Sequence, residues 1–444
     1  MRDEHKPLLL RGARQVGKST AVRQLGTRFD SFVEVNFERN PNFKELFQQD
    51  LDVRRIVPQM EAIVGSSIVP GKTLLFFDEI QACPEAIMAL RFFKEDLPQL
   101  HVVAAGSLLE FALDDLPTFG VGRIHSMYMH PMTFDEFLLA NGEQLLLEAR
   151  NRASVAEPLP GLLHQKLEHL LRVYMLVGGM PAVVAKWVET GNFLDCQELQ
   201  DDIIVSYEDD FPKYKKRVDS VLLRHVLRSV ALQASHKFVY AQVGDYKGID
   251  VKNALELLVR AGLVVPVQQT KANGVPLGGE ANGSNRKMLL FDIGLMLRLL
   301  NMALGDISEP TNQILLGSAV DLVNKGSVAE MFAGLELLRY REPNLRHELF
   351  YWSREAKNSQ AEVDYVVQHR ARVLPVEVKA GMQGGMKSLW LFMREKALLQ
   401  AVRCSLENFG AMDYVDAEAN NANRRVIICP LYALSQLNRL LMEA

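Results

Sequence analysis

A glycine-rich segment near the start of the chain has the residue types and spacing that bind a phosphate chain. It satisfies the pattern GxxxxGK[ST] with Gly12, Ala13, Arg14, Gln15, Val16, Gly17, Lys18 and Ser19, and Thr20 follows. The two glycines permit a tight turn, and backbone N–H groups of the loop would face a phosphate. Lys18 would reach the β and γ phosphates, while the Ser19 hydroxyl would ligate Mg2+. A chance match in a strand, turn and helix is the alternative. The segment therefore predicts binding of a nucleoside triphosphate with Mg2+.

Two acids farther along the chain could complete this site. Asp78 and Glu79 follow the apolar run 74–77, which predicts a buried strand that delivers both at the edge where α/β sheets bind ligands. Asp78 would hold Mg2+, usually through water, and Glu79 would orient and polarise the attacking water. A surface Asp-Glu pair is the alternative. The acids predict hydrolysis as well as binding, and the lack of an NKxD-like guanine-reading sequence favours ATP.

Two further residues could act on the γ-phosphate. Ser107 follows the next expected strand, where its side chain could sense this phosphate, although a simple turn serine would look the same. Arg123 lies in GVGRIH and could be an arginine finger or a contact to a lid. A surface arginine before a strand is an equally good interpretation of Arg123.

The elements that must position these residues alternate in the first part of the chain. Short apolar runs at residues 7–12, 31–37, 73–80 and 101–107 are separated by amphipathic segments. Buried runs of this length between helices favour a mostly parallel α/β sheet. We therefore expect a P-loop NTPase core over residues 1–140.

The remaining chain shows three different patterns. Helical periodicity predicts a lid over residues 141–215, interrupted by GGMP at 178–181. Residues 216–286 hold a helical stripe that ends at Gly262 and then an apolar run, which suggests a winged helix with 271–287 as a loop or wing tip. A second α/β domain is expected over residues 287–444. Its apolar segments are 287–297, 348–353, 361–368, 372–381 and 421–434, with a helical stretch near 320–340.

Several of these segments resemble one family when they are read in order. GARQVGKST, LLFFDEIQ, AAGSLLEF, the GR of GVGR, HPMTFDEF and VGGMP look like the prokaryotic AAA-type ATPases that carry a conserved C-terminal domain of unknown function. The resemblance covers nearly the whole chain. It implies that Gly179 and Pro181 form a turn in the lid helices against the adenine side of the nucleotide. Such proteins usually have a helical segment before the first strand, whereas six residues precede Pro7 here, so the start is truncated or the adenine pocket is built from elsewhere.

A second set of chemically active residues lies in the last third of the chain. Asp364, Glu377 and Lys379 resemble the D…ExK core of the restriction-endonuclease-like superfamily, which implies that fold for the C-terminal domain. Glu377 and Lys379 are two apart and share one face of a strand. Two carboxylates can clamp Mg2+ beside an ammonium, and Glu330 could complete the set from a helix. The alternative is a polar strand face in a domain that keeps the fold for another purpose.

Composition excludes several classes of protein. The chain has 444 residues, 50 Lys and Arg against 54 Asp and Glu, and a formal charge of -4, so it carries no histone-like arm. Its length argues for about two or three domains. A hydrophobic fraction of 48% excludes a disordered chain, and no apolar run is long enough to span a membrane. The cysteines lack metal or disulfide spacing, which favours a reducing, cytoplasmic setting; they are Cys83, Cys196, Cys404 and Cys429.

Three hypotheses about function and partners follow. The first is a Mg2+-dependent ATPase whose lid and winged helix move against the core. The second is a switch that holds ATP or ADP and controls a protein partner. The third is an ATP-coupled nuclease that acts on DNA. The expected winged helix could contact DNA phosphates, or its mixed charges could form a solvated face, and a homo-oligomer stays open. Its cations are Arg224, His225, Arg228, His236, Lys237, Lys247, Lys252 and Arg260.

Overall fold

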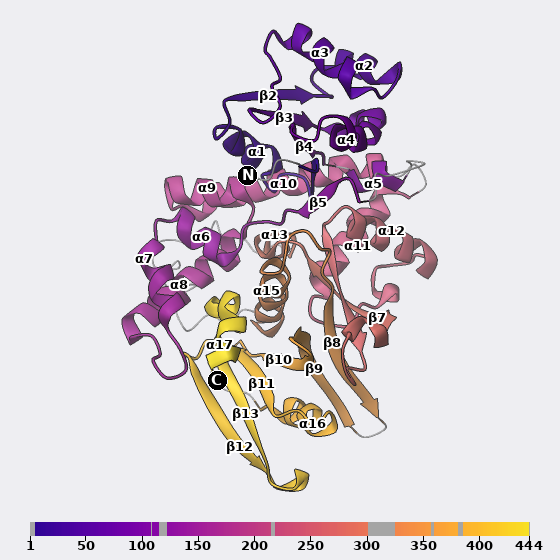
Figure 1. Ribbon diagram of the computed structural model, residues 1–444. Helices are drawn as coiled ribbons and strands as arrows, with labels where there is room; N and C mark the ends of the chain where they lie inside the picture. The colour runs from indigo at the N-terminus through magenta and orange to yellow at the C-terminus, as the bar shows by residue number, and fades with distance from the viewer. Residues whose placement is uncertain are drawn as a thin grey trace.

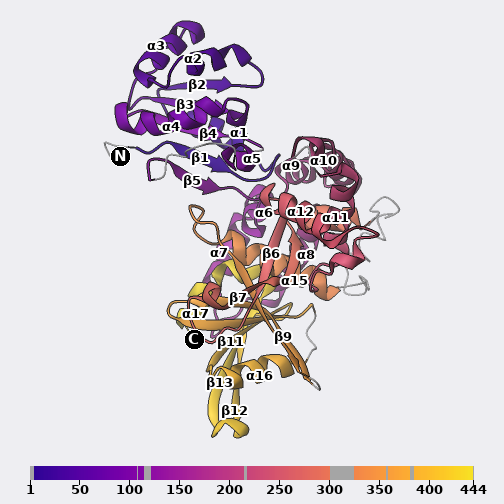
Figure 2. The ribbon, with the colours of Figure 1, turned by 90° about the vertical axis from the view of Figure 1, so that its right-hand side faces the viewer.

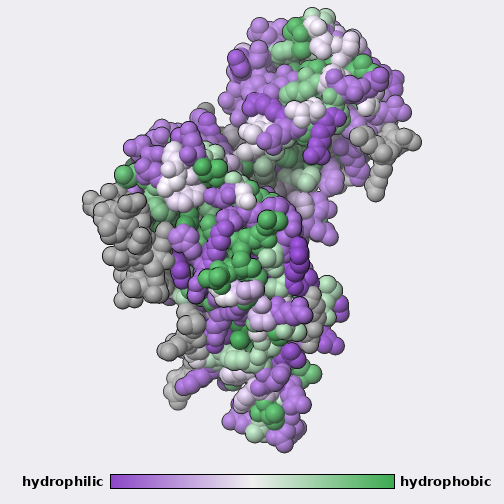
Figure 3. All heavy atoms as spheres, turned by 90° about the vertical axis from the view of Figure 1, so that its left-hand side faces the viewer, coloured by the Kyte–Doolittle hydropathy of each residue, from purple (hydrophilic) through white to green (hydrophobic). Residues whose placement is uncertain are grey.

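The computed structural model describes residues 5–107, 109–114, 122–214, 218–300, 325–356, 359–380 and 385–443. They form two bodies: an N-terminal α/β body and a larger body that holds the rest of the chain (Figure 1; side view in Figure 2). The outline narrows where the two bodies meet (Figure 3). Among the described helices, none is long and apolar enough to cross a lipid bilayer.

The N-terminal body is built on a five-stranded sheet in the order β2-β3-β4-β1-β5. All neighbouring strands run parallel, as the alternation of apolar runs and helices predicted. Its strands are β1 (Leu8–Arg11), β2 (Ser31–Asn36), β3 (Thr73–Asp78), β4 (His101–Ala105) and β5 (His125–Tyr128). Its helices are α1 (Lys18–Gly26), α2 (Glu45–Gln48), α3 (Val53–Val64), α4 (Pro84–Asp96) and α5 (Leu109–Asp114).

Alternate residues of β3 explain why this sheet is covered on both faces. Leu75 and Phe77 belong to the apolar cluster formed with α3 and α4. Leu74 and Phe76 point to the opposite face and pack in the cluster that contains Val22 of α1. Side chains of a strand alternate between faces, so a continuous apolar run such as 74–77 is stable only where helices cover both sides. This burial fixes the end of β3 and therefore the position of Asp78.

A helical segment follows the N-terminal body. Its helices are α6 (Phe134–Ala140), α7 (Gln144–Arg152), α8 (Gly161–Val177), α9 (Pro181–Thr190), α10 (Phe193–Tyr214), α11 (Ser220–Leu232) and α12 (Gly248–Arg260). The GGMP sequence separates α8 from α9, and Pro181 is the first residue of α9. Gly262 follows α12 with φ of 75°, a left-handed conformation that ends the helix and leads into β6.

The larger body contains an eight-stranded sheet in the order β12-β13-β11-β10-β9-β8-β6-β7. Its strands are β6 (Val264–Thr270), β7 (Ala281–Leu290), β8 (Leu349–Ala356), β9 (Ser359–His369), β10 (Arg372–Val378), β11 (Gln400–Ser405), β12 (Gly410–Asp416) and β13 (Ala422–Pro430). The accompanying helices are α13 (Ile293–Leu299), α15 (Lys325–Arg339), α16 (Lys387–Glu395) and α17 (Leu437–Glu443).

One hydrophobic core joins the helical segment to the eight-stranded sheet. The same cluster of buried side chains contains Leu167 of α8, Leu255 of α12 and Val376 of β10. The sheet is also shared, because β6 pairs in parallel with β8 across a long stretch of sequence. The segments expected to be a lid, a winged helix and a C-terminal domain are therefore packed as one body.

The structure differs from the sequence expectations at two places. Residues 271–287 were expected to be a loop or wing tip, but β7 begins at Ala281 and crosses the expected boundary at residues 286 and 287. Cross-strand pairing with β6 overrides the Gly and Asn content of this segment. The apolar segment 287–297 divides at Asp292, whose side chain accepts a hydrogen bond from Leu295 N (3.0 Å) and begins α13. Residues 320–324 of the expected helix and Gly381 of the expected strand lie outside the described residues.

Candidate functional site

The loop between β1 and α1 has the backbone conformation of a phosphate-binding turn. Gly12, Gln15 and Gly17 have φ values of 136°, 62° and 94°. A Cβ atom at Gly12 would lie 2.1 Å from the carbonyl oxygen of Met129, so only glycine fits where the loop passes the end of β5. Gly12 and Gly17 therefore supply backbone conformations that few other residues adopt, and Gly12 also leaves the space that the Met129 carbonyl occupies.

Lys18 lies at the start of α1 and reaches back over the loop. Its Nζ donates hydrogen bonds to the carbonyl oxygens of Gly12 (2.9 Å) and Ala13 (2.7 Å). Burial lowers the pKa of Lys18 to about 8, although the carboxylates of Glu79 and Asp78 oppose this shift. The ammonium is thus held at the loop and would gain favourable charge interactions from a phosphate placed there.

A hydrogen bond joins Ser19, near the start of α1, to Asp78, at the end of β3. Ser19 Oγ donates a hydrogen bond to Asp78 Oδ1 (2.9 Å), and Asn36 Nδ2 donates one to Asp78 Oδ2 (3.1 Å). Burial raises the pKa of Asp78, while the hydrogen bond from Ser19 acts in the opposite direction. These hard oxygen ligands fit Mg2+, which commonly takes one or two protein ligands and completes its shell with phosphate and water oxygens. Sequence reasoning missed Asn36, which lies directly beside Asp78 in the register of β2 and β3.

Glu79 follows Asp78 and is oriented by two polar side chains. Its φ is 49°, and its Oε2 accepts hydrogen bonds from Gln81 Nε2 (2.6 Å) and Ser107 Oγ (3.2 Å). Ser107 lies beyond the end of β4, the strand between β3 and β1. A Cβ atom at Gly106 would lie 2.0 Å from Gln81 Oε1, so glycine makes room for Gln81. The structure brings together Glu79 and Ser107, and adds Gln81, which sequence reasoning missed.

Helix α10 holds the outer part of the phosphate loop. Arg14 forms an ion pair with Asp210, and Tyr207 Oη donates a hydrogen bond to the carbonyl oxygen of Arg14. Gln15 Nε2 donates to Ser206 Oγ (3.1 Å). These partners are about half the chain away in sequence, so no local pattern could reveal them. The larger body therefore contacts the loop that would bind the phosphates.

The GGMP turn also reaches the loop. A Cβ atom at Gly17 would lie 3.4 Å from Cγ of Pro181, so the proline packs beside the start of α1. Gly179 N donates a hydrogen bond to Asp292 Oδ2 (2.7 Å), and Gly179 O accepts one from Met132 N (2.7 Å). Asp292 is fully buried. The turn is thus fixed by a carboxylate that sequence reasoning did not assign to the site.

Arg123 does not lie with these residues. Its guanidinium forms an ion pair with Glu95 on α4, and both side chains are partly exposed. In this arrangement Arg123 makes a contact within the N-terminal body.

Two of the cations expected to contact DNA have other positions in the structure. Arg224 pairs with Glu208 of α10, and Arg260 lines the cavity described next.

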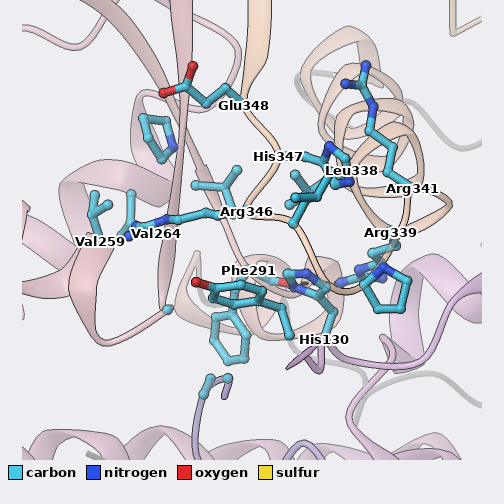
Figure 4. Close-up of a pocket in the computed structure, with 18 of the residues that line it drawn as sticks. His130, Val259, Val264, Phe291, Leu338, Arg339, Arg341, Arg346, His347 and Glu348 are labelled. Carbon is cyan, nitrogen blue, oxygen red and sulfur yellow. Dashed lines mark hydrogen bonds between the residues drawn. The ribbon is translucent and has the colours of Figure 1, made fainter. Parts of the chain in front are cut away.

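A cavity of about 660 Å3 opens beside the phosphate loop and between the two bodies. Gly12, Ser107 and Tyr128 line it at the carboxyl ends of β1, β4 and β5. Figure 4 shows Arg346 pointing towards Val264, with Phe291 and His130 on another side of the cavity. Tyr128 N donates a hydrogen bond to Pro343 O (2.8 Å), which attaches the segment after α15 to the end of β5. The volume lies within the range of small-molecule sites.

The second set of residues also comes together, but in a different form from the one expected. Glu377 pairs with Lys379 (2.6 Å), and Asp364 Oδ2 accepts a hydrogen bond from Val378 N (2.7 Å). Glu330 lies at the same cluster and binds Lys287 (2.7 Å). Within the described ranges, no group of three or more His, Cys, Asp or Glu side chains is arranged to hold a metal ion. Two of the expected metal ligands, Glu330 and Glu377, are therefore each paired with a lysine, and Asp364 accepts a backbone hydrogen bond.

Comparisons with known families divide the chain into three matched segments. Residues 4–138 match the family described as AAA domain. Residues 168–305 and 325–432 match two domains of unknown function, DUF8612 and DUF4143. The N-terminal body is therefore the part of the chain that is similar to the AAA domain family. The match over residues 325–432 gives no function to the C-terminal segment.

Other comparisons add little. No curated protein matches the chain. The Walker-type ATPase of Pyrococcus abyssi is similar at 17% identity and a TM-score of 0.42, over 66% of this chain and 90% of that one. Cdc6p from Pyrobaculum aerophilum is similar at 10% identity and a TM-score of 0.23, over 68% of this chain and 89% of that one. At such low scores, these two similarities carry no argument about fold or function.

Proposed function

We propose that the protein binds ATP with Mg2+ at the loop Gly12–Ser19 and hydrolyses it. The observation that carries this proposal is the hydrogen bond between Ser19, which follows β1, and Asp78 at the end of β3, with Glu79 next to Asp78; β1 and β3 flank β4 in the parallel sheet. The AAA domain match over residues 4–138 supports it. ATPases of this type need a phosphate loop, two acids and a lysine within one small volume.

Each residue has a separate task in the proposed reaction. Backbone N–H groups of the loop and the Lys18 ammonium bind the β and γ phosphates. Ser19 and Asp78 would hold Mg2+, which supplies positive charge against the phosphate oxygens. Glu79 accepts a hydrogen bond from the attacking water, while Ser107 and Gln81 keep its carboxylate in place.

Hydrolysis would change the position of the N-terminal body relative to the larger body. Arg14 and Gln15 contact α10, and Gly17 contacts Pro181, so a phosphate that alters the loop also alters these contacts. Because the helical segment and the eight-stranded sheet share one core, we expect them to respond together. This refines the lid movement expected from the sequence.

A slow nucleotide switch is the second candidate. Lys18 binds the loop carbonyls and Asp210 binds Arg14, so the chain itself stabilises one conformation of the loop. Such contacts favour slow exchange of ATP or ADP and control of a protein partner.

All four cysteines are free and buried, which fits a reducing location such as the cytoplasm.

Release of inorganic phosphate from ATP tests the proposal. The Glu79→Gln variant should keep Mg·ATP binding and lose about a hundredfold or more in turnover, as expected for loss of a general base. Glu198→Gln, at an exposed position of α10, is the matched control and should turn over like the wild type. Equal rates for Glu79→Gln and wild type would contradict the assignment.

A further inference from the structure

The cavity between the two bodies contains cations that the proposed ATPase reaction does not use. Gly12 of the phosphate loop and Ser107 line it, but Lys18, Ser19 and Asp78 are not among the described residues that do. The cavity therefore adjoins the groups that would hold the phosphates and Mg2+ and is not formed by them. Its volume of about 660 Å3 leaves room for a separate small molecule.

Arg341 lines this cavity just after the end of α15 and lacks an acidic partner. Burial lowers the pKa of Arg341, and no carboxylate of the described residues raises it again. Arg339, two residues earlier, differs in this respect, because its guanidinium donates hydrogen bonds to Tyr174 Oη (2.8 Å) and Phe291 O (2.7 Å). A half-buried cation is costly unless an acceptor compensates its charge. An anion is therefore missing at Arg341.

The acids that line the cavity do not fill this place. Glu110 forms an ion pair with Arg11, and Glu348 Oε1 accepts a hydrogen bond from a glutamine side chain (3.0 Å). Glu342, the third acid in the described lining, is exposed. Within the described ranges none of the three is close enough to Arg341 to raise its pKa. The compensating charge has to come from outside the chain.

The rest of the lining suits the apolar part of a ligand. Phe291 and Leu338 are buried and line the cavity, and Arg346 adds a second cation that extends towards the apolar Val264 (Figure 4). Burial lowers the pKa of His130 to about 4, so this imidazole is neutral near pH 7 and can donate or accept a hydrogen bond. A few charged and polar groups in an apolar cavity are typical of a site for an organic ligand.

We propose that this cavity binds a small amphipathic organic anion, with its charged group at Arg341 and Arg346 and its apolar part against Phe291 and Leu338. The ligand is a molecule other than ATP. It contacts both bodies and therefore joins them at a second place beside the phosphate loop. This inference concerns binding to the nucleotide-free protein and does not depend on ATP hydrolysis.

Fluorescence titration of the nucleotide-free protein with anilinonaphthalene sulfonate, an aromatic anion, tests the proposal. Phenylnaphthylamine is the matched probe, because it has the same rings without the sulfonate. We expect the anion to bind at one site per chain and about tenfold more tightly than the neutral probe. Arg341→Met and Arg346→Met should each weaken binding of the anion by about tenfold without weakening that of the neutral probe. Arg372→Met, which removes an exposed arginine of β10 outside the cavity, should bind both probes like the wild type.

Two further measurements separate this role from others. Arg341→Met removes a half-buried charge that has no acidic partner, so its melting temperature should equal or exceed that of the wild type, whereas loss of a structural arginine would lower it. Lys18→Met should bind the anion like the wild type, because Lys18 does not line the cavity. Absence of anion binding by wild type, unchanged binding by Arg341→Met or a lower melting temperature of this variant would each overturn the proposal. An equal loss of anion binding in Lys18→Met would also overturn it, because the probe would then lie at the phosphate loop.

Discussion

Ser19 Oγ donates a 2.9 Å hydrogen bond to Asp78 Oδ1, which joins the first residues of α1 to the end of β3. The two residues are far apart in the sequence. They meet because the parallel strands β1 and β3, which have β4 between them, end at the same edge of the sheet. Burial of β3 on both faces fixes Asp78, while the helix that follows the loop fixes Ser19.

Replacement of Ser19 by alanine should weaken binding of Mg·ATP by about tenfold or more, because one Mg2+ ligand and one hydrogen bond to a carboxylate are lost. Binding of ATP without Mg2+ should change much less. Calorimetric titration with and without Mg2+ measures both quantities. Thr27→Ala, at the exposed end of α1, is the control. An equal loss with and without Mg2+ would contradict the role of Ser19.

Ser107→Ala should lower kcat and leave KM for ATP nearly unchanged. The variant removes the hydrogen bond from Ser107 Oγ to Glu79 Oε2 (3.2 Å), which positions the proposed base. We expect a loss of about tenfold in kcat, less than for removal of the base itself. Steady-state kinetics give both constants. Ser67→Ala, at an exposed position, should have no effect, and a change confined to KM would argue against the contact.

The stability of the nucleotide-free protein should depend on the protonation of Lys18. Its pKa is lowered from 10.5 to about 8 by burial, so between these pH values the unfolded chain binds more protons than the folded one. The contribution of Lys18 to the free energy of unfolding therefore rises with pH in this range. Urea unfolding from pH 7.5 to 10 should show this rise in wild type relative to Lys18→Met. Parallel curves for the two proteins would show that Lys18 keeps its ordinary pKa.

Asp292→Ala should destabilise the protein by about 2 to 4 kcal/mol, because it leaves the buried N–H groups of Gly179 and Leu295 without their acceptor. It should also raise KM for ATP, since the turn that presents Pro181 to the loop is released. Asp292→Asn can accept one of the two hydrogen bonds and should lie between wild type and Asp292→Ala in both measurements. Unfolding in urea and steady-state kinetics give the two values. Loss of stability without a change in KM would limit Asp292 to a structural role.

Asp210→Asn should speed the exchange of bound nucleotide. The variant removes the charge that holds Arg14 on α10, while Tyr207 still contacts the loop backbone. Displacement of a fluorescent ATP analogue by unlabelled ATP measures the dissociation rate. Asp209→Asn, the neighbouring acid on α10, is the matched control. Unchanged dissociation in Asp210→Asn would show that α10 does not restrain the loop.

The sequence was sufficient for the parts of the site that depend on local patterns. The loop glycines, Lys18, Ser19, Asp78 and Glu79 occur in short motifs next to apolar runs, and such runs predict strands well. The partners of these residues could not be predicted, because Asp210, Asp292 and Gln81 become neighbours only through tertiary packing. Lys287 illustrates the limit most clearly. It was expected at the end of a loop or wing tip, whereas it lies in β7, which pairs with β6, and its side chain is buried and bonded to Glu330.

Calorimetric titration of the purified protein with Mg·ATP tests the central claim most directly. Wild type and Lys72→Ala, which removes an exposed lysine outside the loop, should bind ATP in a saturable manner with one site per chain. Lys18→Ala should show no such binding, because the phosphates lose their buried ammonium. Absence of binding by folded wild type, or equal binding by Lys18→Ala, would contradict the assignment of the nucleotide site.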